Sequence, residues 1–131
     1  MKYKHRLEFK VRDYECDIQG VVNNAVYQNY LEHARHEWLL KAGINFAKLA
    51  LKKINLVVIR VELDYKWPLL AGEEFYIETT AQQISRIRFK FQQNICRSGD
   101  NKLILQGKII GASLNQKGRP AVVEELVGLF A

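Results

Sequence analysis

One long amphipathic helix, accompanied mainly by alternating segments, limits the folds open to this chain. The apolar positions of the helix follow one another at steps of four, three and four: Tyr27, Leu31, Ala34 and Trp38. This spacing places a single apolar stripe along the helix. Asn23 or Asn24 can cap the start of the helix, and Gly43 can end it. A second, shorter helix is predicted over residues 45–53.

Five further segments alternate between apolar and polar residues, as strands with one buried face do. They cover residues 6–12, 57–67, 74–82, 86–97 and 102–114, and a short terminal helix is predicted within residues 118–131. One helix and several one-sided strands are buried together most simply when an antiparallel sheet curls around the helix, which is an α+β arrangement. Such a sheet leaves its edge strands unpaired, so we expect a homodimer or a homotetramer.

Length and composition indicate one globular domain covering residues 1–131. The chain is 48% hydrophobic, which is enough to build a core. The N-terminal residues contain no apolar run that resembles a signal peptide or a membrane span, so we expect a cytoplasmic protein without membrane insertion. Cys16 and Cys96 match no metal-ligand spacing and no disulfide framework, and both are predicted to be free thiols.

The formal net charge of +6 makes an anionic partner plausible, although ordinary solubility charge explains it equally well. Nucleic acid, a membrane surface and a phosphorylated cofactor would all be attracted. Binding of nucleic acid is disfavoured by the pattern of residues 86–97. There Phe89 and Phe91 alternate with Arg88 and Lys90, so rings and cations lie on opposite faces of the strand.

The segment that leads into the long helix carries the candidate chemistry. From Asp17 onward the sequence has the pattern D-x-x-G-V-V-N-N-x-x-Y-x-x-Y-x-E-x-x-R. Asp17 can attack a carbonyl carbon or deprotonate a water molecule, while N–H groups of the first helical turn stabilise negative charge on the carbonyl oxygen. Gly20 permits a sharp turn, and the amides around Asn23 and Asn24 are the candidate oxyanion donors. An aspartate that only caps a turn is the competing interpretation.

This pattern resembles the signature of the hotdog-fold acyl-CoA thioesterases, specifically the 4-hydroxybenzoyl-CoA thioesterase family and its Tol-Pal-associated relatives. The resemblance covers about residues 3–126 and implies a hotdog fold, in which the sheet wraps around one central helix. It also implies hydrolysis of an acyl-CoA thioester with Asp17 as the catalytic residue. No metal or redox cofactor is implied, because coenzyme A is part of the substrate. Many relatives have Tyr-His or Trp-Tyr in place of Asn23-Asn24, so a side-chain role for these two positions is left open.

The resemblance implies further site residues. An acyl tunnel between helix and sheet, at the subunit boundary, would be lined by Val22, Tyr27 and Tyr65. The residues expected to contact the phosphates of coenzyme A are Ser85, Arg86 and Arg88, with Lys117 and Arg119 as weaker candidates. Acyl carrier protein thioesters are alternative substrates. The alternative function is a hotdog module that binds acyl-CoA without hydrolysing it.

Other polar residues of the segment have simpler interpretations. Glu32 and Arg35 lie three positions apart on the helix and are predicted to form an ion pair that braces it. Cys16 offers a thiol nucleophile, but it would need a basic partner to form the thiolate. No histidine is well placed for this task, because all three are predicted to face solvent: His5, His33 and His36.

Overall fold

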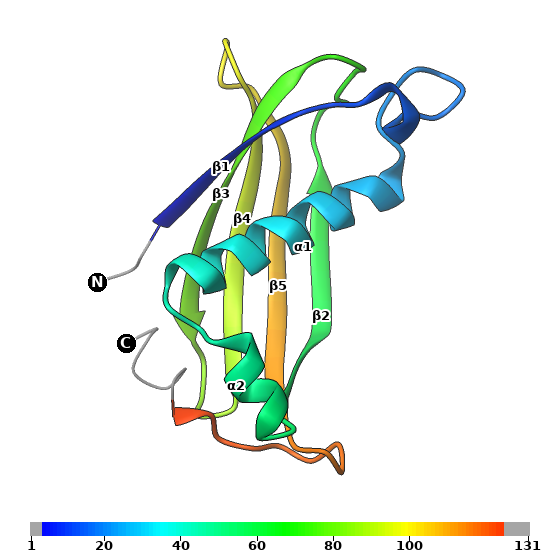
Figure 1. The fold of residues 1–131 in the computed structure, drawn as a ribbon. Helices are drawn as coiled ribbons and strands as arrows, with labels where there is room; N and C mark the ends of the chain where they lie inside the picture. Colours follow the sequence, from blue (N-terminus) through cyan, green and yellow to red (C-terminus); the bar gives the residue numbers. More distant parts are fainter. Residues whose placement is uncertain (1–3, 125–131) are drawn as a thin grey trace.

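A five-stranded antiparallel sheet curves around one long helix in the computed structural model, which describes residues 4–124 (Figure 1). The elements in chain order are β1 (Lys4–Lys10), the short 3-10 helix η1 (Asp13–Glu15), α1 (Asn24–Lys41), α2 (Phe46–Leu51), β2 (Asn55–Tyr65), β3 (Glu74–Gln83), β4 (Arg88–Arg97) and β5 (Leu103–Leu114). The strands are ordered β1-β3-β4-β5-β2, and all neighbours are antiparallel. β1 and β2 are therefore the two edges of the sheet.

The five predicted strands and the first two predicted helices are present, with ends shifted by up to two residues. Alternation reveals that a strand exists, whereas its ends depend on where neighbouring strands stop pairing. The predicted terminal helix lies largely outside the described residues. Residues 118–123 are not helical and Pro120 pairs with Leu114, whereas Glu124, the last described residue, is helical.

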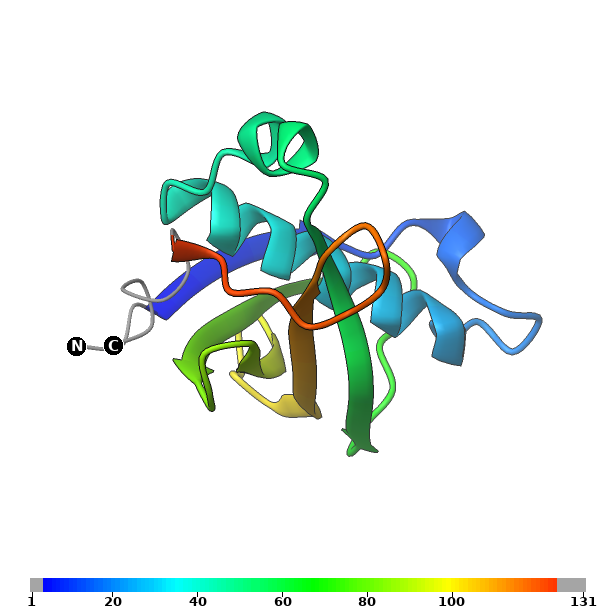
Figure 2. The same cartoon turned by 90° about the horizontal axis from the view of Figure 1, so that it is seen from below.

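α1 lies against the concave face of the sheet (Figure 2). Its apolar stripe is buried in the core, as predicted. Its members expose 3% of their surface or less: Tyr27, Leu31, Ala34 and Trp38. The start of α1 is held by Asn23, whose side-chain oxygen accepts a hydrogen bond from the N–H of Ala25 at 2.9 Å. The chain leaves the helix at Gly43, where φ is +94°. Both predicted ends of the helix are confirmed.

β2 is more exposed than its alternation predicted. Val58, Ile59 and Val61 expose 49%, 47% and 38% of their surface. β2 pairs with β5 on one side only, and its register shifts between Val58 and Arg60. An irregularity of this kind redirects side chains that strict alternation would send to one face. β2 therefore carries a half-exposed apolar strip, Val58, Ile59 and Val61, at one edge of the sheet.

His5 is buried with 9% exposure, so the prediction that all three histidines face solvent was wrong for this residue. Strand alternation places His5 on the same face of β1 as Leu7, toward α1. Burial lowers the pKa of His5 and outweighs the opposing charge of Glu37. His33 and His36 are exposed, as predicted. No helix within residues 4–124 is long and apolar enough to cross a membrane.

Candidate active site

A short loop before α1 holds Asp17 near the helix start. Cys16 pairs with Val22 across the loop, and the N–H of Asp17 donates to the carbonyl of Val21 at 2.8 Å. Gly20 turns the chain with a φ of +82°, a conformation that is costly for residues with a side chain. The loop thus returns the chain to the start of α1, as the glycine in the sequence predicted.

The side chain of Asp17 is exposed and partly engaged. Its Oδ1 accepts a hydrogen bond from the N–H of Gln19 at 2.9 Å, which is the turn-capping role that competed with catalysis. The other carboxylate oxygen, Oδ2, makes no hydrogen bond with any described residue. The cap therefore orients the carboxylate and leaves one oxygen for a substrate or a water molecule.

Among the backbone amides of Gly20, Asn23 and Asn24, only that of Asn24 is unoccupied. The N–H of Gly20 donates to the Asp17 carbonyl at 3.0 Å, and the N–H of Asn23 donates to the Glu15 carbonyl at 3.1 Å. Asn24 is the first residue of α1, and its N–H has no acceptor within residues 4–124. It lies at the positive end of the helix dipole, where a donor to substrate oxygen is most effective.

Two tyrosines pack together beside the helix start. Tyr65, at the end of β2, is 49% exposed and donates its hydroxyl to the carbonyl of Asn24 at 3.3 Å. The ring of Tyr27 lies edge-on to that of Tyr65 at 5.6 Å, and its hydroxyl accepts from the N–H of Leu69. Burial raises the pKa of Tyr27, so it is a neutral packing residue. Val22 is a core residue with 2% exposure.

The thiol of Cys16 is a poor nucleophile in this setting. Desolvation raises the pKa of Cys16, and the neighbouring carboxylates, Asp17 first, raise it further. A raised pKa keeps the sulfur protonated at neutral pH, and the thiolate is the reactive form. The part of the chain that the structure describes also holds no cluster of three His, Cys, Asp or Glu side chains suited to a metal ion.

A trough runs along α1 on the side of β2, where the acyl tunnel was expected, but other residues line it. It consists of two hollows with cavity volumes of about 280 and 150 Å³. Four residues border both hollows: Glu32, Arg35, Val58 and Ile109. None of the predicted lining residues borders either hollow: Val22, Tyr27 and Tyr65.

Arg35 does not form the predicted ion pair with Glu32. Its Nη1 donates instead to Oε1 of Gln93 in β4 at 3.0 Å. Gln93 is fully buried, and its side-chain nitrogen donates to the Leu31 carbonyl and to the Thr79 hydroxyl, both at 3.0 Å. Burial lowers the pKa of Arg35. Arg35 therefore donates to the fixed oxygen of Gln93 beneath the helix and not to the solvated carboxylate of Glu32 on its surface.

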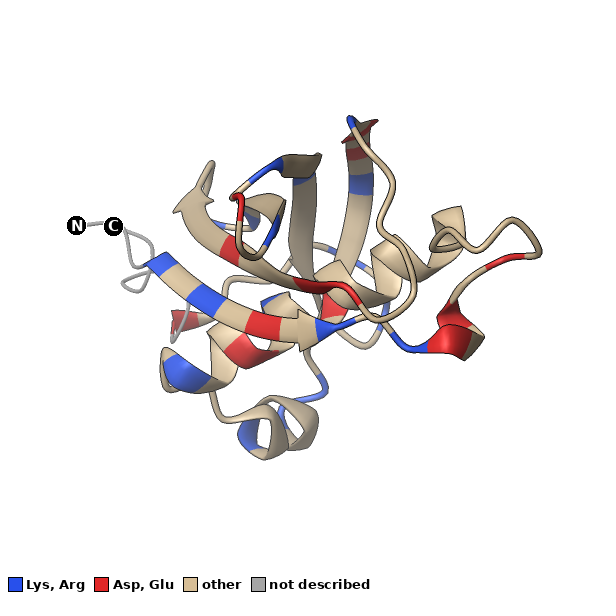
Figure 3. Ribbon diagram, turned by 90° about the horizontal axis from the view of Figure 1, so that it is seen from above, with Lys and Arg blue, Asp and Glu red and all other residues tan. Residues whose placement is uncertain are grey.

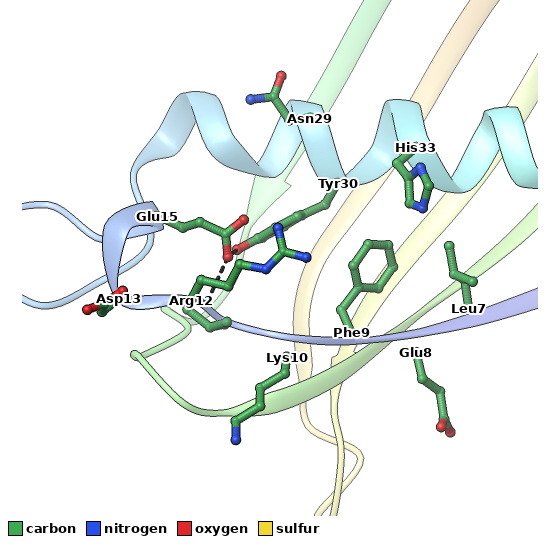
Figure 4. A pocket seen from close by; sticks show the side chains of 11 residues that line it. Leu7, Glu8, Phe9, Lys10, Arg12, Asp13, Glu15, Asn29, Tyr30 and His33 are labelled. Atoms are coloured by element: carbon green, nitrogen blue, oxygen red, sulfur yellow. Dashed lines mark hydrogen bonds between the residues drawn. The ribbon is translucent and has the colours of Figure 1, made fainter.

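A larger hollow of about 800 Å³ lies on the other side of α1, between the helix, β1 and η1 (Figure 4). It is a weaker candidate for the acyl site because charged residues of both signs line it and the carboxylate of Glu15 is already hydrogen-bonded. Oε1 of Glu15 accepts from the hydroxyl of Tyr30 at 2.8 Å and from the N–H of Arg12 at 2.7 Å. Burial raises the pKa of Tyr30, so its phenol stays neutral.

The predicted phosphate contacts lie at the opposite end of the sheet from the Asp17 loop (Figure 1). They follow β3 and begin β4, whereas the end of β4 at Arg97 lies beside Glu73, near the loop. The ten residues of β4 span roughly 30 Å at about 3.3 Å per residue. Ser85 also caps its own turn, since its Oγ accepts from the N–H of Arg88 at 3.1 Å. One chain therefore does not bring Ser85, Arg86 or Arg88 to Asp17.

Comparison with known proteins agrees with this architecture. The family described as the thioesterase-like superfamily matches residues 11–127. A chloroplastic acyl-acyl carrier protein thioesterase of Arabidopsis thaliana, ATL2, is 39% identical over 119 residues, which are 91% of this chain and 63% of that protein. The chain thus spans less than two thirds of that relative. The long-chain acyl-CoA thioesterase FadM of Escherichia coli is 25% identical over 118 residues, 90% of this chain and 89% of FadM.

A solved structure shows the same fold over nearly the whole chain. Slr0204, a 1,4-dihydroxy-2-naphthoyl-CoA thioesterase from Synechocystis, superposes with a TM-score of 0.91 at 16% identity, covering 98% of this chain and 96% of that one. The predicted α+β hotdog fold is confirmed.

Proposed function

Because the chain belongs to the thioesterase-like superfamily, we propose that it hydrolyses an acyl-CoA thioester to a free carboxylic acid and coenzyme A. The observation that carries this proposal is that two groups at the helix start, one acceptor and one donor, are both unoccupied. Oδ2 of Asp17 and the N–H of Asn24 lie at either end of one short loop, and neither is bonded to a described residue. An attacker and an oxyanion donor suffice for a thioester, because a thiolate with a pKa of about 8.5 leaves readily.

In the proposed reaction, Asp17 forms a bond to the carbonyl carbon or removes a proton from the water that attacks it. Either step moves an electron pair onto the carbonyl oxygen, where the Asn24 amide donates a hydrogen bond. The C–S bond then breaks, and its electron pair leaves with the thiolate of coenzyme A. In the first route, water hydrolyses the resulting anhydride and restores the carboxylate. No metal or redox cofactor takes part.

A homodimer joined along β2 is part of the proposal. The exposed apolar strip of β2 suits a second copy, because edge strands with unpaired backbone groups add strands readily. Antiparallel pairing centred on Val61 would set Arg60 opposite the partner subunit's Glu62. It would also bring the partner's β3–β4 turn, with its arginines, toward the Asp17 loop. The phosphate contacts would then come from the second subunit.

Two points of substrate and location are also proposed. By their names, the Arabidopsis relative acts on acyl carrier protein thioesters and FadM acts on acyl-CoA. We favour coenzyme A for this chain because the turn with Arg86 and Arg88 offers guanidinium groups for its phosphates. We place the reaction in the cytoplasm.

The second candidate function is an acyl-CoA-binding module without hydrolysis. The turn cap made by Asp17 favours it, since a structural duty alone would account for the carboxylate. Thiol release from short, long and aromatic acyl-CoA substrates separates the two candidates. Binding of these thioesters without release by the wild type would favour the module.

The matched variant is Asp17→Asn, which keeps an oxygen to accept the Gln19 N–H but removes the carboxylate. We expect kcat to fall by about 10³-fold, with an unchanged melting temperature. If Cys16→Ala abolished release and Asp17→Asn did not, the nucleophile would be misassigned.

A further inference from the structure

We propose that the trough beside α1 limits the length of the bound acyl chain, with Phe46 and Phe89 as its end wall, and that it favours chains of about 12 to 14 carbons. This inference rests on the proposed function, because the chain length is counted from a thioester at the helix start. It assigns to α2 and β4 a role in selecting the substrate.

The order of the two hollows gives the trough a direction. α1 and β2 run in opposite directions, so Gln28 and Val61 border the hollow nearer the helix start. Leu39 and Leu56 border the smaller hollow, which lies farther along α1. A chain whose carbonyl is held by Asn24 would therefore enter beside Gln28 and extend toward α2.

Aromatic side chains bound the smaller hollow. Phe46, the first residue of α2, stacks on His36 with ring centroids 4.5 Å apart. Phe89 lies directly over Gly111: a Cβ built on this glycine would be 2.5 Å from the Phe89 ring. The ring thus fills the space that a side chain at position 111 would need. The position of this part of the wall depends on the absence of a side chain at Gly111.

The length of α1 converts this geometry into a number of carbons. The fifteen steps from Asn24 to Leu39 advance about 22 Å along the helix axis at about 1.5 Å per residue. Helical side chains lean toward the N-terminus by roughly one turn, or about 5 Å, which leaves about 17 Å. An extended alkyl chain with bonds of about 1.5 Å and angles near 111° advances about 1.25 Å per carbon. The hollow that Leu39 shares with Phe46 and Phe89 is therefore reached near carbon 13.

Arg35, which borders both hollows, is compatible with an alkyl chain passing it. Its guanidinium is tethered to Gln93, which is itself held by Leu31 and Thr79 under the helix. An arginine anchored at its charged end can offer its methylene stem to an apolar neighbour. In the proposed complex, this stem forms the wall at the junction of the two hollows.

Two substitutions should move the wall in opposite directions. Phe46→Ala removes a ring from the end of the trough and should raise the hexadecanoyl to dodecanoyl ratio of kcat/KM by about 10-fold. Gly111→Ala pushes the Phe89 ring into the hollow and should shift the optimum toward octanoyl- and decanoyl-CoA. Leu51→Ala is the matched control on α2, since Leu51 is 84% exposed and lies outside the trough. Its chain-length profile should equal that of the wild type.

Binding provides a readout that does not require turnover. Calorimetric titration with the non-hydrolysable thioethers dodecyl-CoA and hexadecyl-CoA should show tighter binding of the C12 compound to the wild type and a reversed or lost preference in Phe46→Ala. Melting temperatures report whether each variant is folded.

The outcomes separate this inference from the proposed function. If thiol is released and neither substitution shifts the chain-length profile, the proposed length limit is overturned and hydrolysis is retained. If no thiol is released but the C12 thioether binds more tightly as expected, hydrolysis is overturned and the length limit is retained. Equal binding of both thioethers, or binding of neither, would overturn the length limit.

Discussion

The two ends of the sheet differ in charge and in the chemistry that they can support. Residues 13–24 at the helix-start end include Asp13, Glu15 and Asp17 and no lysine or arginine (Figure 3). The turns at the other end, residues 84–88 and 115–119, carry four basic residues and no acidic one. A coenzyme A thioester has a reactive carbonyl at one end and phosphates at the other. The difference teaches that a single chain holds its acidic loop and its basic turns too far apart to act on one substrate molecule. In the proposed dimer along β2, the acidic loop of one subunit would lie beside the basic turns of the other.

The largest expected effect tests the helix-start end. Asn24→Pro removes the unoccupied N–H, while proline suits the first position of a helix. Asn23 already has φ −62° and ψ 139°, which a residue before proline favours. We expect kcat for thiol release to fall by about 10² to 10³-fold with little change in melting temperature. Asn24→Ala keeps the N–H and should remain near wild type. A fully active Asn24→Pro enzyme would exclude this amide from the reaction.

The next effect tests whether the two ends must meet between copies. Ile59→Asp places a charge in the half-exposed apolar strip of β2 and should separate the subunits. We expect kcat/KM to fall by about 100-fold, because the phosphate contacts would lose their position relative to Asp17. Light scattering after size-exclusion chromatography gives the oligomeric state. Leu51→Asp, on the exposed side of α2, is the control. A monomeric variant with full activity would show that one chain is sufficient.

A smaller effect is expected at the basic end. Arg88→Ala should raise KM for acyl-CoA by about 10-fold and leave kcat unchanged, since it removes binding energy far from the reacting carbonyl. The difference from wild type should shrink as salt is added, because exposed charges are screened. Lys10→Ala on β1 is the matched loss of one positive charge. A KM that changes equally in both variants would indicate general attraction instead of a phosphate contact.

The smallest expected effects concern the pH dependence of folding stability, to which His5 and Asp100 contribute in different pH ranges. Burial lowers the pKa of His5 below 6.5, so the unfolded chain binds this proton more readily and stability should fall as pH drops below about 6.5. The hydrogen bond from Arg97 lowers the pKa of Asp100 to about 2, so its contribution is present above pH 4 and is lost as pH falls toward 2. Urea midpoints between pH 8 and pH 2 measure both. His5→Gln should remove the loss of stability below about pH 6.5, and Asp100→Asn should remove the loss of stability toward pH 2.

Much of the fold was predictable because periodicity is a local property. The stripe from Tyr27 to Trp38 and the alternation of the strands indicated one helix against a one-sided sheet, and both are present. The exposure of β2 was not predictable from its own residues. It depends on the strand order, which leaves β2 at an edge, and on the irregularity after Val58.

The candidate site divides in the same way. The position of Asp17 on a glycine turn before a capped helix follows from residues that are neighbours in sequence. The partner of Arg35 does not, because Gln93 lies 58 residues away. Its signal was a lone polar residue on the apolar face of β4, between Phe91 and Ile95.

The sequence alone determined the elements, the turn at Gly20 and the order of carboxylate, turn and helix start, because each depends on interactions within a few residues. Only the tertiary structure decided which amide stays unoccupied, since the Glu15 carbonyl takes the N–H of Asn23 and leaves that of Asn24. It also decided that the acidic loop and the basic turns lie at opposite ends of the sheet. Hydrogen-bond partners and distances between elements depend on how distant segments pack, and no local pattern encodes that packing.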